Sequence, residues 1–576
     1  MFSSRKWIGP NVDAATPYFT ELFIVRTVGF LALLLANVTW IMGYAATPAK
    51  ATFIGAAYNI EDFCNYLSWM RQTSTGHFFL TNLFTTDHQI PIQFNVLFLF
   101  LGIVSRVLHA NIAAVFDGAK VVFGGLFLAS IWRLIKHCLR DSATARMVAF
   151  ALTCFSSGWG WLIASRWANE NTRFSPIDAW QPEAYTFLSL DTSTLFCASS
   201  LLIVCTFLML LKSEDTRSVR YAVYAGVYAL FLTNIHTYDI IHVSITWLIY
   251  LLSKSIIVSS KEAARSWGRA LVALAIASPA LAYQLYMYHA DPIFHARAGV
   301  PTLSPAFRYY ACGYGVVFVL AILGVALLIY VILRRVTVRT AQDGIPHFGT
   351  KNAAIFVACW AVGGFVSAYL PVAFQRKMIM GEQIPLCILA GYTVAMLCQR
   401  MPRRSRTFIG SLLVLISAPS NVCFLARDFR HLSSNTSESA AHIPYLQDSE
   451  LAVLEWIAAS TGPNDAVLGI PQSCAVVPGW TGHHVWAGHW GETPDFGKKV
   501  NEFALFANAS TPDSYACEFL RTTETQYLWY PNDTSPLSMV TRGGRLVRYR
   551  DLRSQPLACL TLEYANKDYS IYKISS

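Results

Sequence analysis

Two adjacent carboxylates, Glu61 and Asp62, are the first residues along the chain whose types and spacing suggest chemistry. They begin a stretch in which Phe63, Tyr66 and Met70 recur on one helical face, which predicts an amphipathic helix on the bilayer surface. Acids in the first turn of a helix are stabilised by the helix dipole, and this alone can explain the pair. A carboxylate pair at a membrane interface could also take a proton from an acceptor or hold a cation.

A second acidic cluster, Asp178 and Glu183, is interleaved with Trp180 and Tyr185. Aromatic rings stack on the C–H faces of sugars and carboxylates accept hydrogen bonds from sugar hydroxyls, so the pattern is typical of a sugar-binding site. The same residue types also form the aromatic belt of a membrane protein beside solvated acids. The sequence leaves both interpretations open.

Two further polar groups lie at the ends of apolar stretches, His236 with Asp239 and Arg376 with Lys377. Charged groups at membrane depth are costly and usually functional. An arginine binds phosphate through two parallel hydrogen bonds, and a neighbouring lysine adds charge, so we favour a phosphate site at 376–377. The alternative is that both side chains reach toward lipid headgroups.

The composition indicates which elements must position these residues. Of 576 residues, 54% are hydrophobic and only 14% are charged, against about 25% charged in a soluble domain. This excludes a soluble globular chain. The abundance of apolar and aromatic residues and the lack of a short repeat exclude fibrous and disordered classes. The chain is therefore predicted to be an α-helical polytopic membrane protein.

A membrane-spanning helix needs about 20 mostly apolar residues, and twelve stretches are candidates. The basic loops are expected on one side of the membrane, so an odd number of crossings must separate the loops 46–89 and 137–145. This favours about 11 crossings, with the short segment 90–108 the doubtful one. The segment 219–253 reads either as one helix broken near His236 or as two short helices, and the loop charges favour two. The candidates are 23–45, 90–108, 113–136, 146–165, 191–211, 219–235, 237–253, 267–287, 308–333, 352–373, 383–399 and 406–426.

Loops rich in Lys and Arg alternate with loops rich in aromatics and proline. The basic set, such as RLIKHCLRDSATAR and QRMPRRSR, is expected in the cytoplasm together with the N-terminus. Loops 46–89 and 166–190 and everything after about 427 are then outside. The topology accounts for much of the net charge of +10, so no nucleic-acid partner is needed.

The last part of the chain is too polar to span a membrane. Residues 1–430 are expected to form the transmembrane domain, and residues 431–576 a small external α/β domain. The stretches SELAVLEWIAAS and GKKVNEFALFAN have helical spacing, 466–470 and 526–530 read as strands, and 560–565 with 569–574 as a hairpin. Three cysteines lie in this domain, so at most one disulfide forms among them: Cys474, Cys517 and Cys559.

Five segments, taken in order, carry a resemblance that runs from about residue 20 to 510. The chain resembles polytopic GT-C glycosyltransferases that use lipid-phosphate sugar donors, in the form of bacterial GT-C-like membrane proteins with a small external C-terminal domain. The acids here read Glu-Asp rather than the commoner Asp-Glu, and only Ile90-Pro91 stands for a proline-rich segment. The five segments are EDFCNYLSWMRQ, DAWQPEAYTFLSL, NIHTYDII, FQRKMIMGEQIPLCILAG and HHVWAGHWGETPDFGKKVNEF.

The resemblance implies inverting transfer of a sugar from a polyprenyl-phosphate donor to a lipid or glycan acceptor on the outer face, as in a bacterial inner membrane with a periplasmic C-terminal domain. Asp62 would be the catalytic base, with Glu61 as the alternative. Arg376 and Lys377 would neutralise the leaving phosphate. The remaining substrate-binding candidates are Asp178, Trp180, Glu183, His236 and Asp239.

A group of residues in the C-terminal part could cover the acceptor cleft. His483, His489 and Glu492 could equally form a metal site, although their spacing matches no standard pattern, and a plain folded surface is the third interpretation. No pattern demands a metal, so a divalent cation such as Mg²⁺ or Mn²⁺ stays open. The group is Trp480, His483, His489, Trp490, Glu492 and Asp495.

Two other classes of protein remain as alternatives, namely a lipid or glycan transporter or flippase and a non-catalytic assembly protein that kept the fold. A transporter needs polar residues at mid-bilayer depth. The predicted spans are nearly free of charge, and the ionisable residues gather at the outer boundary. This distribution favours chemistry at the interface.

Overall fold

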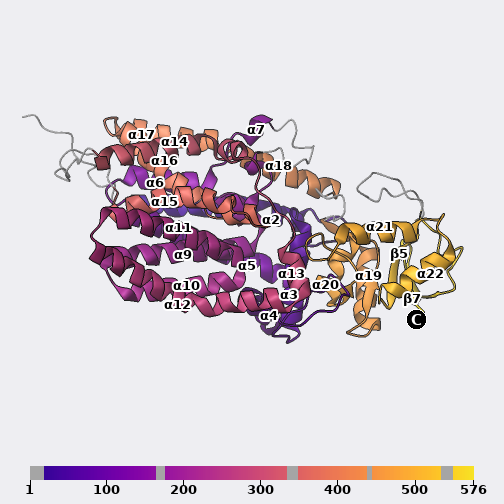
Figure 1. The fold of residues 1–576 in the computed structure, drawn as a ribbon. Helices are drawn as coiled ribbons and strands as arrows, with labels where there is room; N and C mark the ends of the chain where they lie inside the picture. The colour runs from indigo at the N-terminus through magenta and orange to yellow at the C-terminus, as the bar shows by residue number, and fades with distance from the viewer. Residues whose placement is uncertain (1–17, 164–175, 334–347, 437–443, 534–548, 576) are drawn as a thin grey trace, which may run out of the picture.

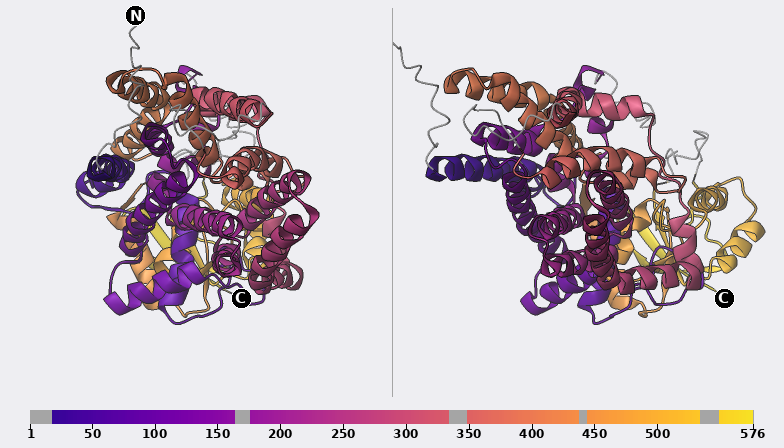
Figure 2. Two further views of the ribbon diagram at one scale, coloured as in Figure 1. Left: turned by 90° about the vertical axis from the view of Figure 1, so that its left-hand side faces the viewer. Right: turned by 60° about the vertical axis from the view of Figure 1, so that its left-hand side comes forward.

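A computed structural model describes residues 18–163, 176–333, 348–436, 444–533 and 549–575. The first part of the predicted external loop 166–190 therefore lies outside the described residues. Long helices run side by side in a bundle, and the C-terminal part sits beyond one end of that bundle (Figures 1 and 2). The protein is thus a helical polytopic membrane protein with a small C-terminal sheet region, as predicted.

Within the described ranges, seven helices are long and apolar enough to cross a membrane. Two bent helix pairs raise the number to nine, α1 with α2 (Tyr18–Ala36, Val38–Ala45) and α17 with α18 (Arg403–Ser417, Pro419–Ser434). Six of the seven are α5 (Ile112–Cys138), α9 (Thr194–Thr216), α11 (Thr237–Ile257), α12 (Ser260–Ala290), α14 (Phe307–Leu333) and α15 (Lys351–Ala368). The seventh is the stretch Gln375–Cys398, in which a short 3₁₀ helix precedes α16 (Gln383–Cys398).

The difference from about 11 predicted crossings has a simple physical cause. Three of the twelve candidate stretches form helices of only 13, 13 and 17 residues, which fall short of about 20 residues needed to cross the hydrocarbon core alone. The short helices are α4 (Val96–Leu108), α6 (Ala143–Phe155) and α10 (Val219–Ile235). Helices α10 and α11 are separate and meet at His236, as the loop charges favoured.

Helix α3 (Ile60–Ser74) follows the first bent pair and corrects one prediction. It does not lie on a lipid surface, because residues on all its sides are buried, including Phe63, Tyr66 and Trp69. One side packs on α4 and α5, and another contacts α20 (Val476–Thr481) in the C-terminal part. The apolar periodicity is real, but protein covers the face that was assigned to lipid.

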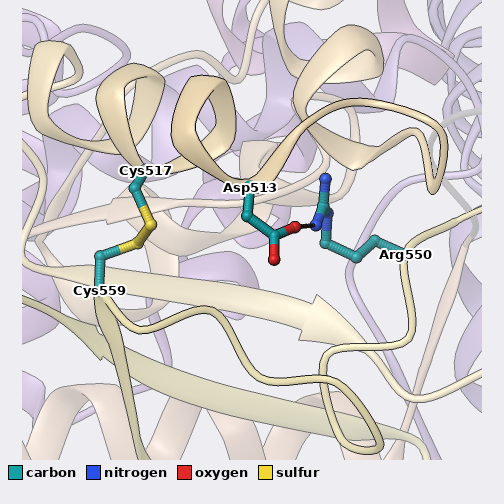
Figure 3. Close-up of a disulfide and its surroundings, with 4 residues drawn as sticks. All are labelled: Asp513, Cys517, Arg550 and Cys559. Atoms are coloured by element: carbon teal, nitrogen blue, oxygen red, sulfur yellow. Dashed lines mark hydrogen bonds and ion pairs between the residues drawn. A yellow bond between two sulfur atoms is a disulfide. The ribbon is translucent and has the colours of Figure 1, made fainter.

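The C-terminal part is built on a five-stranded sheet with the order β4-β3-β5-β7-β6. The predicted hairpin is confirmed as β6 (Leu560–Ala565) paired antiparallel with β7 (Tyr569–Ile574). A disulfide joins Cys517 to Cys559 (Figure 3). The other elements here are β3 (Ala466–Leu468), β4 (His484–Val485), β5 (Tyr527–Pro531), α19 (Asp448–Ser460), α21 (Phe496–Ala507) and α22 (Asp513–Thr522).

A second, two-stranded sheet ties the C-terminal part to the loop 46–89, which is predicted to be external. Strand β1 (Ala51–Phe53) pairs antiparallel with β2 (Tyr445–Gln447), so segments nearly 400 residues apart share hydrogen bonds. Together with the contact of α3 on α20, this pairing joins the loop and the C-terminal domain into one unit at this end of the bundle.

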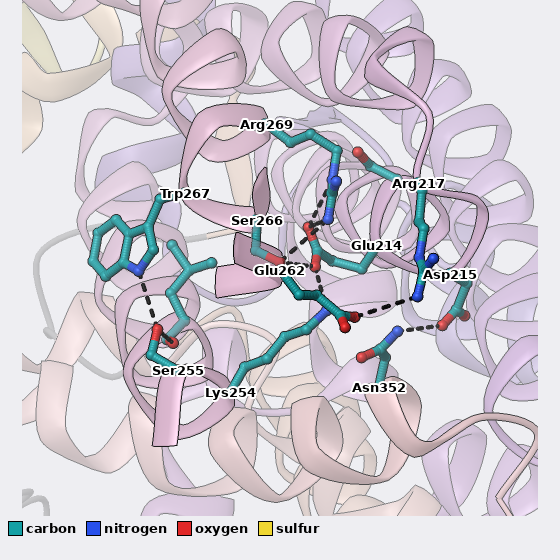
Figure 4. A network of polar contacts seen from close by, with 12 residues as sticks. Glu214, Asp215, Arg217, Lys254, Ser255, Glu262, Ser266, Trp267, Arg269 and Asn352 are labelled. Atoms are coloured by element: carbon teal, nitrogen blue, oxygen red, sulfur yellow. Dashed lines mark hydrogen bonds and ion pairs between the residues drawn. The ribbon is translucent and has the colours of Figure 1, made fainter. Parts of the chain in front are cut away.

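The opposite end of the bundle holds a buried ion network (Figure 4). Glu214 at the end of α9 accepts hydrogen bonds from Lys254 on α11 and from Arg269 on α12, at 2.6 and 2.8 Å. Helix α5 also contains a buried pair, Asp117 and Lys120, at 3.8 Å. The spans thus carry few charges, as expected, and the buried charges of these two groups are paired with one another.

Candidate functional site

A cavity of about 870 Å³ lies between the bundle and the C-terminal part. Its wall is made by the start of α3, the ends of α10 and α12, the start of α11, and loops that carry residues 179–183, 298–302, 372–377 and 489–492. It brings together eight of the predicted site residues, from segments far apart in the sequence: Asp62, Trp180, Glu183, His236, Arg376, Lys377, His489 and Glu492. Trp490, also singled out, lines it as well.

The other predicted site residues are not among those that line this cavity. Asp178 is fully buried and accepts hydrogen bonds from the backbone N–H groups of Gly158 and Gly160, each at 3.0 Å. Burial raises the pKa of its carboxyl to about 6. Asp178 thus holds a glycine-containing turn in place, and its contacts are structural.

Glu61 occupies the first turn of α3 but is also outside the lining, so the structure separates the two members of the acid pair. In the C-terminal part, the backbone carbonyl of Trp480 accepts a hydrogen bond from Arg71. The ring of His483 contacts Thr461 at 2.9 Å. Asp495 stands at the N-cap position of α21 in a left-handed conformation, without a side-chain capping bond, and is likewise not a lining residue.

Asp239 acts on the cavity through His236. Its side chain is fully buried, and one carboxylate oxygen contacts Nδ1 of His236 at 2.8 Å and accepts a hydrogen bond from Ser199. A neutral histidine with its Nδ1–H held by a carboxylate presents Nε2 as an acceptor. The pair therefore fixes the ring of His236 at the cavity wall.

Asp62 points into the cavity with 32% of its side chain exposed. Asn59 donates to Oδ2 at 2.7 Å from a left-handed backbone conformation that asparagine tolerates. His489 contacts Oδ1 at 3.2 Å. Burial acts to raise the pKa of this carboxyl. The hydrogen bond from His489, the positive charge that its ring carries when protonated and the charge of Lys377 outweigh this effect, so the pKa lies well below its ordinary value.

The basic pair lies across the cavity on a short 3₁₀ helix, Gln375–Ile379. The guanidinium of Arg376 stacks over the ring of Trp180 at 5.1 Å, and the ammonium of Lys377 lies 4.7 Å from the ring centre of Tyr238. Burial raises the pKa of Glu183, against the lowering effect of both basic charges. The aromatic planes thus present two cations toward a single region of the cavity.

Several lining residues were not predicted. Arg297 on α13 (Pro292–Ala298) pairs with Glu492 at 2.9 Å and lies over Trp69. Asn65 donates to the same carboxylate oxygen of Glu492 at 2.7 Å. Arg427 on α18 stacks on Tyr58, whose hydroxyl donates to the carbonyl of Trp180. Arg297 and Arg427 fall in segments that are expected outside, where the positive-inside rule gives no reason for them, and this is the signal that could have found them.

The cavity lining offers no set of ligands for a divalent cation in the described part of the chain. In the part of the chain that the structure describes, no three His, Cys, Asp or Glu side chains converge as a metal site. Asp62 already accepts hydrogen bonds on both oxygens, and Glu492 faces the guanidinium of Arg297. As arranged, these residues do not fit Mg²⁺ or Mn²⁺, and no step below passes through a metal.

The sequence matches no known family model, and no curated protein matches it. Solved structures do resemble the fold. The oligosaccharyltransferase of Archaeoglobus fulgidus is 12% identical with a TM-score of 0.54, over 89% of this chain and 70% of that one. ArnT from Cupriavidus metallidurans is 12% identical with a TM-score of 0.50, over 96% and 98%.

A third structure, the arabinofuranosyltransferase AftD from Mycobacteria, is 13% identical with a TM-score of 0.52 over 96% of this chain, which spans 40% of that larger protein. The three neighbours share the GT-C architecture of polytopic membrane glycosyltransferases. This chain therefore has a GT-C fold, with a cavity at the end of the bundle that carries its C-terminal domain.

Proposed function

We propose that this protein is an integral membrane glycosyltransferase that moves a hexosyl or pentosyl group from a polyprenyl-phosphate donor to a lipid or glycan acceptor on the outer face, with inversion. One observation carries the proposal. A single cavity holds an ionised carboxylate, Asp62, together with two stacked cations, Arg376 and Lys377. The fold neighbours support it, since the Archaeoglobus enzyme has been solved in complex with an inhibitory peptide and a dolichol-phosphate.

Inversion requires one base and one stabilised leaving group. In the proposed reaction, the acceptor hydroxyl attacks the anomeric carbon from the side of Asp62, the C–O bond to the phosphate breaks, and the hydroxyl proton passes to Asp62. A carboxylate with a low pKa is a weak base toward a free hydroxyl. It takes the proton late, when the new bond has made the acceptor oxygen strongly acidic.

The leaving group is a lipid phosphate, which gains negative charge as the bond breaks. Arg376 and Lys377 would stabilise this charge in a partly buried cavity, where such interactions are stronger than in bulk water. Trp180 fixes the plane of the Arg376 guanidinium, so its fork is held ready. Asp178 is no longer proposed to bind the substrate. Glu183 and His236 remain candidates for binding the sugar hydroxyls.

Substitution at Arg376 tests the donor assignment. A charge-assisted hydrogen bond contributes about 1.5–3 kcal/mol, so Arg376→Ala should weaken binding of undecaprenyl phosphate by about ten- to a hundredfold. Arg376→Lys should weaken binding less, because lysine keeps the positive charge but cannot form the two parallel hydrogen bonds of a guanidinium. The measurement is titration of undecaprenyl phosphate into protein in nanodiscs.

Arg308→Ala is the matched control, because Arg308 is an exposed arginine at the start of α14 that stacks on Tyr309 outside the cavity lining. Its affinity for undecaprenyl phosphate should equal that of the parent. If both Arg376 variants also bind like the parent, the basic pair is a headgroup anchor and the donor assignment fails.

The proposed orientation places the N-terminus in the cytoplasm and the C-terminal domain outside. The Cys517–Cys559 disulfide supports it, because such bonds persist in oxidising compartments. A cysteine introduced at the exposed Ser510 should react with a membrane-impermeant maleimide in intact cells. A cysteine at Lys261, in a predicted cytoplasmic loop, should react only after permeabilisation. The reverse pattern would overturn the orientation and the outer-face assignment.

A further inference from the structure

The ring of His489 is held by hydrogen bonds at both of its nitrogens. The ring is 2% exposed, and its Nδ1 accepts from the backbone N–H groups of Gly491 and Glu492 at 2.9 and 3.1 Å. A nitrogen that accepts two N–H groups carries no proton of its own. The proton of the neutral ring is therefore on Nε2, which donates to Oδ1 of Asp62.

The loop around His489 holds the ring in place. Thr493 Oγ1 accepts from the N–H groups of Gly488 and His489 and donates to the carbonyl of Phe84 in the first external loop. The ring of Phe84 packs edge-on against the imidazole, with 5.6 Å between the ring centres. The donor is thus fixed before any substrate arrives.

We propose that His489 is a positioning residue by which the C-terminal domain sets the orientation of Asp62. This inference rests on the proposed function. Asn59 holds one carboxylate oxygen and His489 the other, so the carboxylate plane is fixed and its remaining lone pairs face the cavity. The acceptor proton goes to Asp62, while His489 keeps its own proton, because Nδ1 is already occupied by the two amides.

A second link on the same loop holds it to the bundle. Glu492 accepts from Asn65 on α3 and from Arg297 on α13, and its backbone carbonyl accepts from Asn82 at 2.7 Å. His489 and Glu492 therefore attach one turn of the C-terminal domain to three other segments, namely α3, α13 and the loop that contains Asn82. A displaced C-terminal domain would therefore release Asp62 as well as open the cavity.

The test compares three variants of the full-length protein in nanodiscs. His489→Leu removes the donor, and His489→Gln keeps an N–H group at the position of Nε2. His483→Leu is the matched control, since His483 is also a buried histidine of the same domain and contacts Thr461 and Gly462 outside the cavity lining. Thermal melting checks that all three are folded.

One readout does not depend on turnover. Solid-state NMR of protein labelled with ¹⁵N-histidine, with the signal assigned by its loss in His489→Gln, should show a protonated Nε2 and a bare Nδ1 at pH 7. Asp62→Asn should shift the Nε2 signal and leave Nδ1 unchanged. A protonated Nδ1, or an Nε2 signal that does not change in Asp62→Asn, would overturn the inference regardless of the measured transfer activity.

The second readout is release of undecaprenyl phosphate from its glucosyl, mannosyl and arabinosyl derivatives, with octyl glycosides as acceptors. Misplacement of a reacting group costs up to about 10²-fold in rate, so His489→Leu should lower kcat about ten- to a hundredfold with KM for the donor within twofold. His489→Gln should recover most of this loss. Loss of the donor also raises the pKa of Asp62, so the acid limb of the rate profile should move to higher pH.

The other charged groups around Asp62 and its neighbours Tyr66 and His489 do not change in these variants. They are Lys377, Glu61, Glu183, Arg297 and Glu492. In the Asp62→Asn background, His489→Leu should add no further loss. If Asp62→Asn abolishes transfer and His489→Leu does not reduce it, the positioning role fails and the base assignment stands. If Asp62→Asn is fully active, the base assignment itself is wrong.

Discussion

Replacement of Asp62 by asparagine is expected to lower glycosyl transfer by about 10² or more, the low end of the effect of removing a general base. Asparagine has the shape of aspartate but cannot accept the acceptor proton. Binding of undecaprenyl phosphate should stay within twofold of the parent, because the basic pair that would hold the phosphate is untouched. Transfer rates from the donor panel and the titration measure the two effects separately.

Glu61→Gln is the control for this substitution. Glu61 is the neighbouring acid on the same helix turn and lies outside the cavity lining, so this variant should transfer at the parental rate. Loss of activity in Glu61→Gln with full activity in Asp62→Asn would move the role by one residue. Full activity in both variants would show that neither acid of this pair is the catalytic base.

The local sequence pattern predicts the helices and strands of this protein better than it predicts which residues form the site. The hairpin of β6 and β7 falls where alternating residues and the turn Asn566-Lys567-Asp568 place it, because strand periodicity is a local property. The choice between Glu61 and Asp62 is different. Successive helix residues differ by about 100° in direction, and which direction faces a cavity depends on partners elsewhere in the chain.

Those partners come from far away. Asp62 and His489 are 427 positions apart, as are Asn65 and Glu492. The burial of α3 has the same origin, since its apolar face is covered by α4 and α5 and its other side contacts the C-terminal domain. A single sequence shows that a helix has an apolar face, and it does not show whether lipid or protein covers that face.

Asp178 illustrates the opposite error. Carboxylates among aromatic residues suggest sugar binding, yet this carboxylate is buried and bonded to the N–H groups of Gly158 and Gly160. A side chain at the position of a Cβ on Gly160 would collide with Asp178, so the glycine and the acid form one structural unit. The neighbouring Trp180 and Glu183 do line the cavity, so a stretch of six residues contains both kinds of role.

The buried charges of the spans bear on the transporter alternative. Asp117 with Lys120, and Glu214 with Lys254 and Arg269, are ionisable groups inside the bundle that sequence analysis did not single out. None of them lines the cavity. They are paired among themselves, and Glu214 joins α9 to α11 and α12, so their contacts account for these charges without a solute.

The Glu214 network predicts a large effect on stability. Its side chain is 1% exposed and accepts from Lys254, Ser266 and Arg269, which belong to α11 and α12. Glu214→Gln keeps the volume but leaves two buried cations without a counter-charge. Removing one partner of a buried pair costs about 3–5 kcal/mol, so this variant should melt well below the parent in the same detergent.

Glu262→Gln is the matched control from the same region (Figure 4). Glu262 pairs with Arg217 at 3.7 Å, and their side chains are 38% and 69% exposed. An exposed pair contributes about 0–1 kcal/mol, so the melting temperature of this variant should stay close to that of the parent. Equal melting of the Glu214 and Glu262 variants would show that water reaches the network and that it does not fix α9 against α11 and α12. A lower melting temperature in Glu214→Gln alone, with undecaprenyl phosphate still bound at the other end of the bundle, would separate the groups that hold the helices from those proposed to do the chemistry.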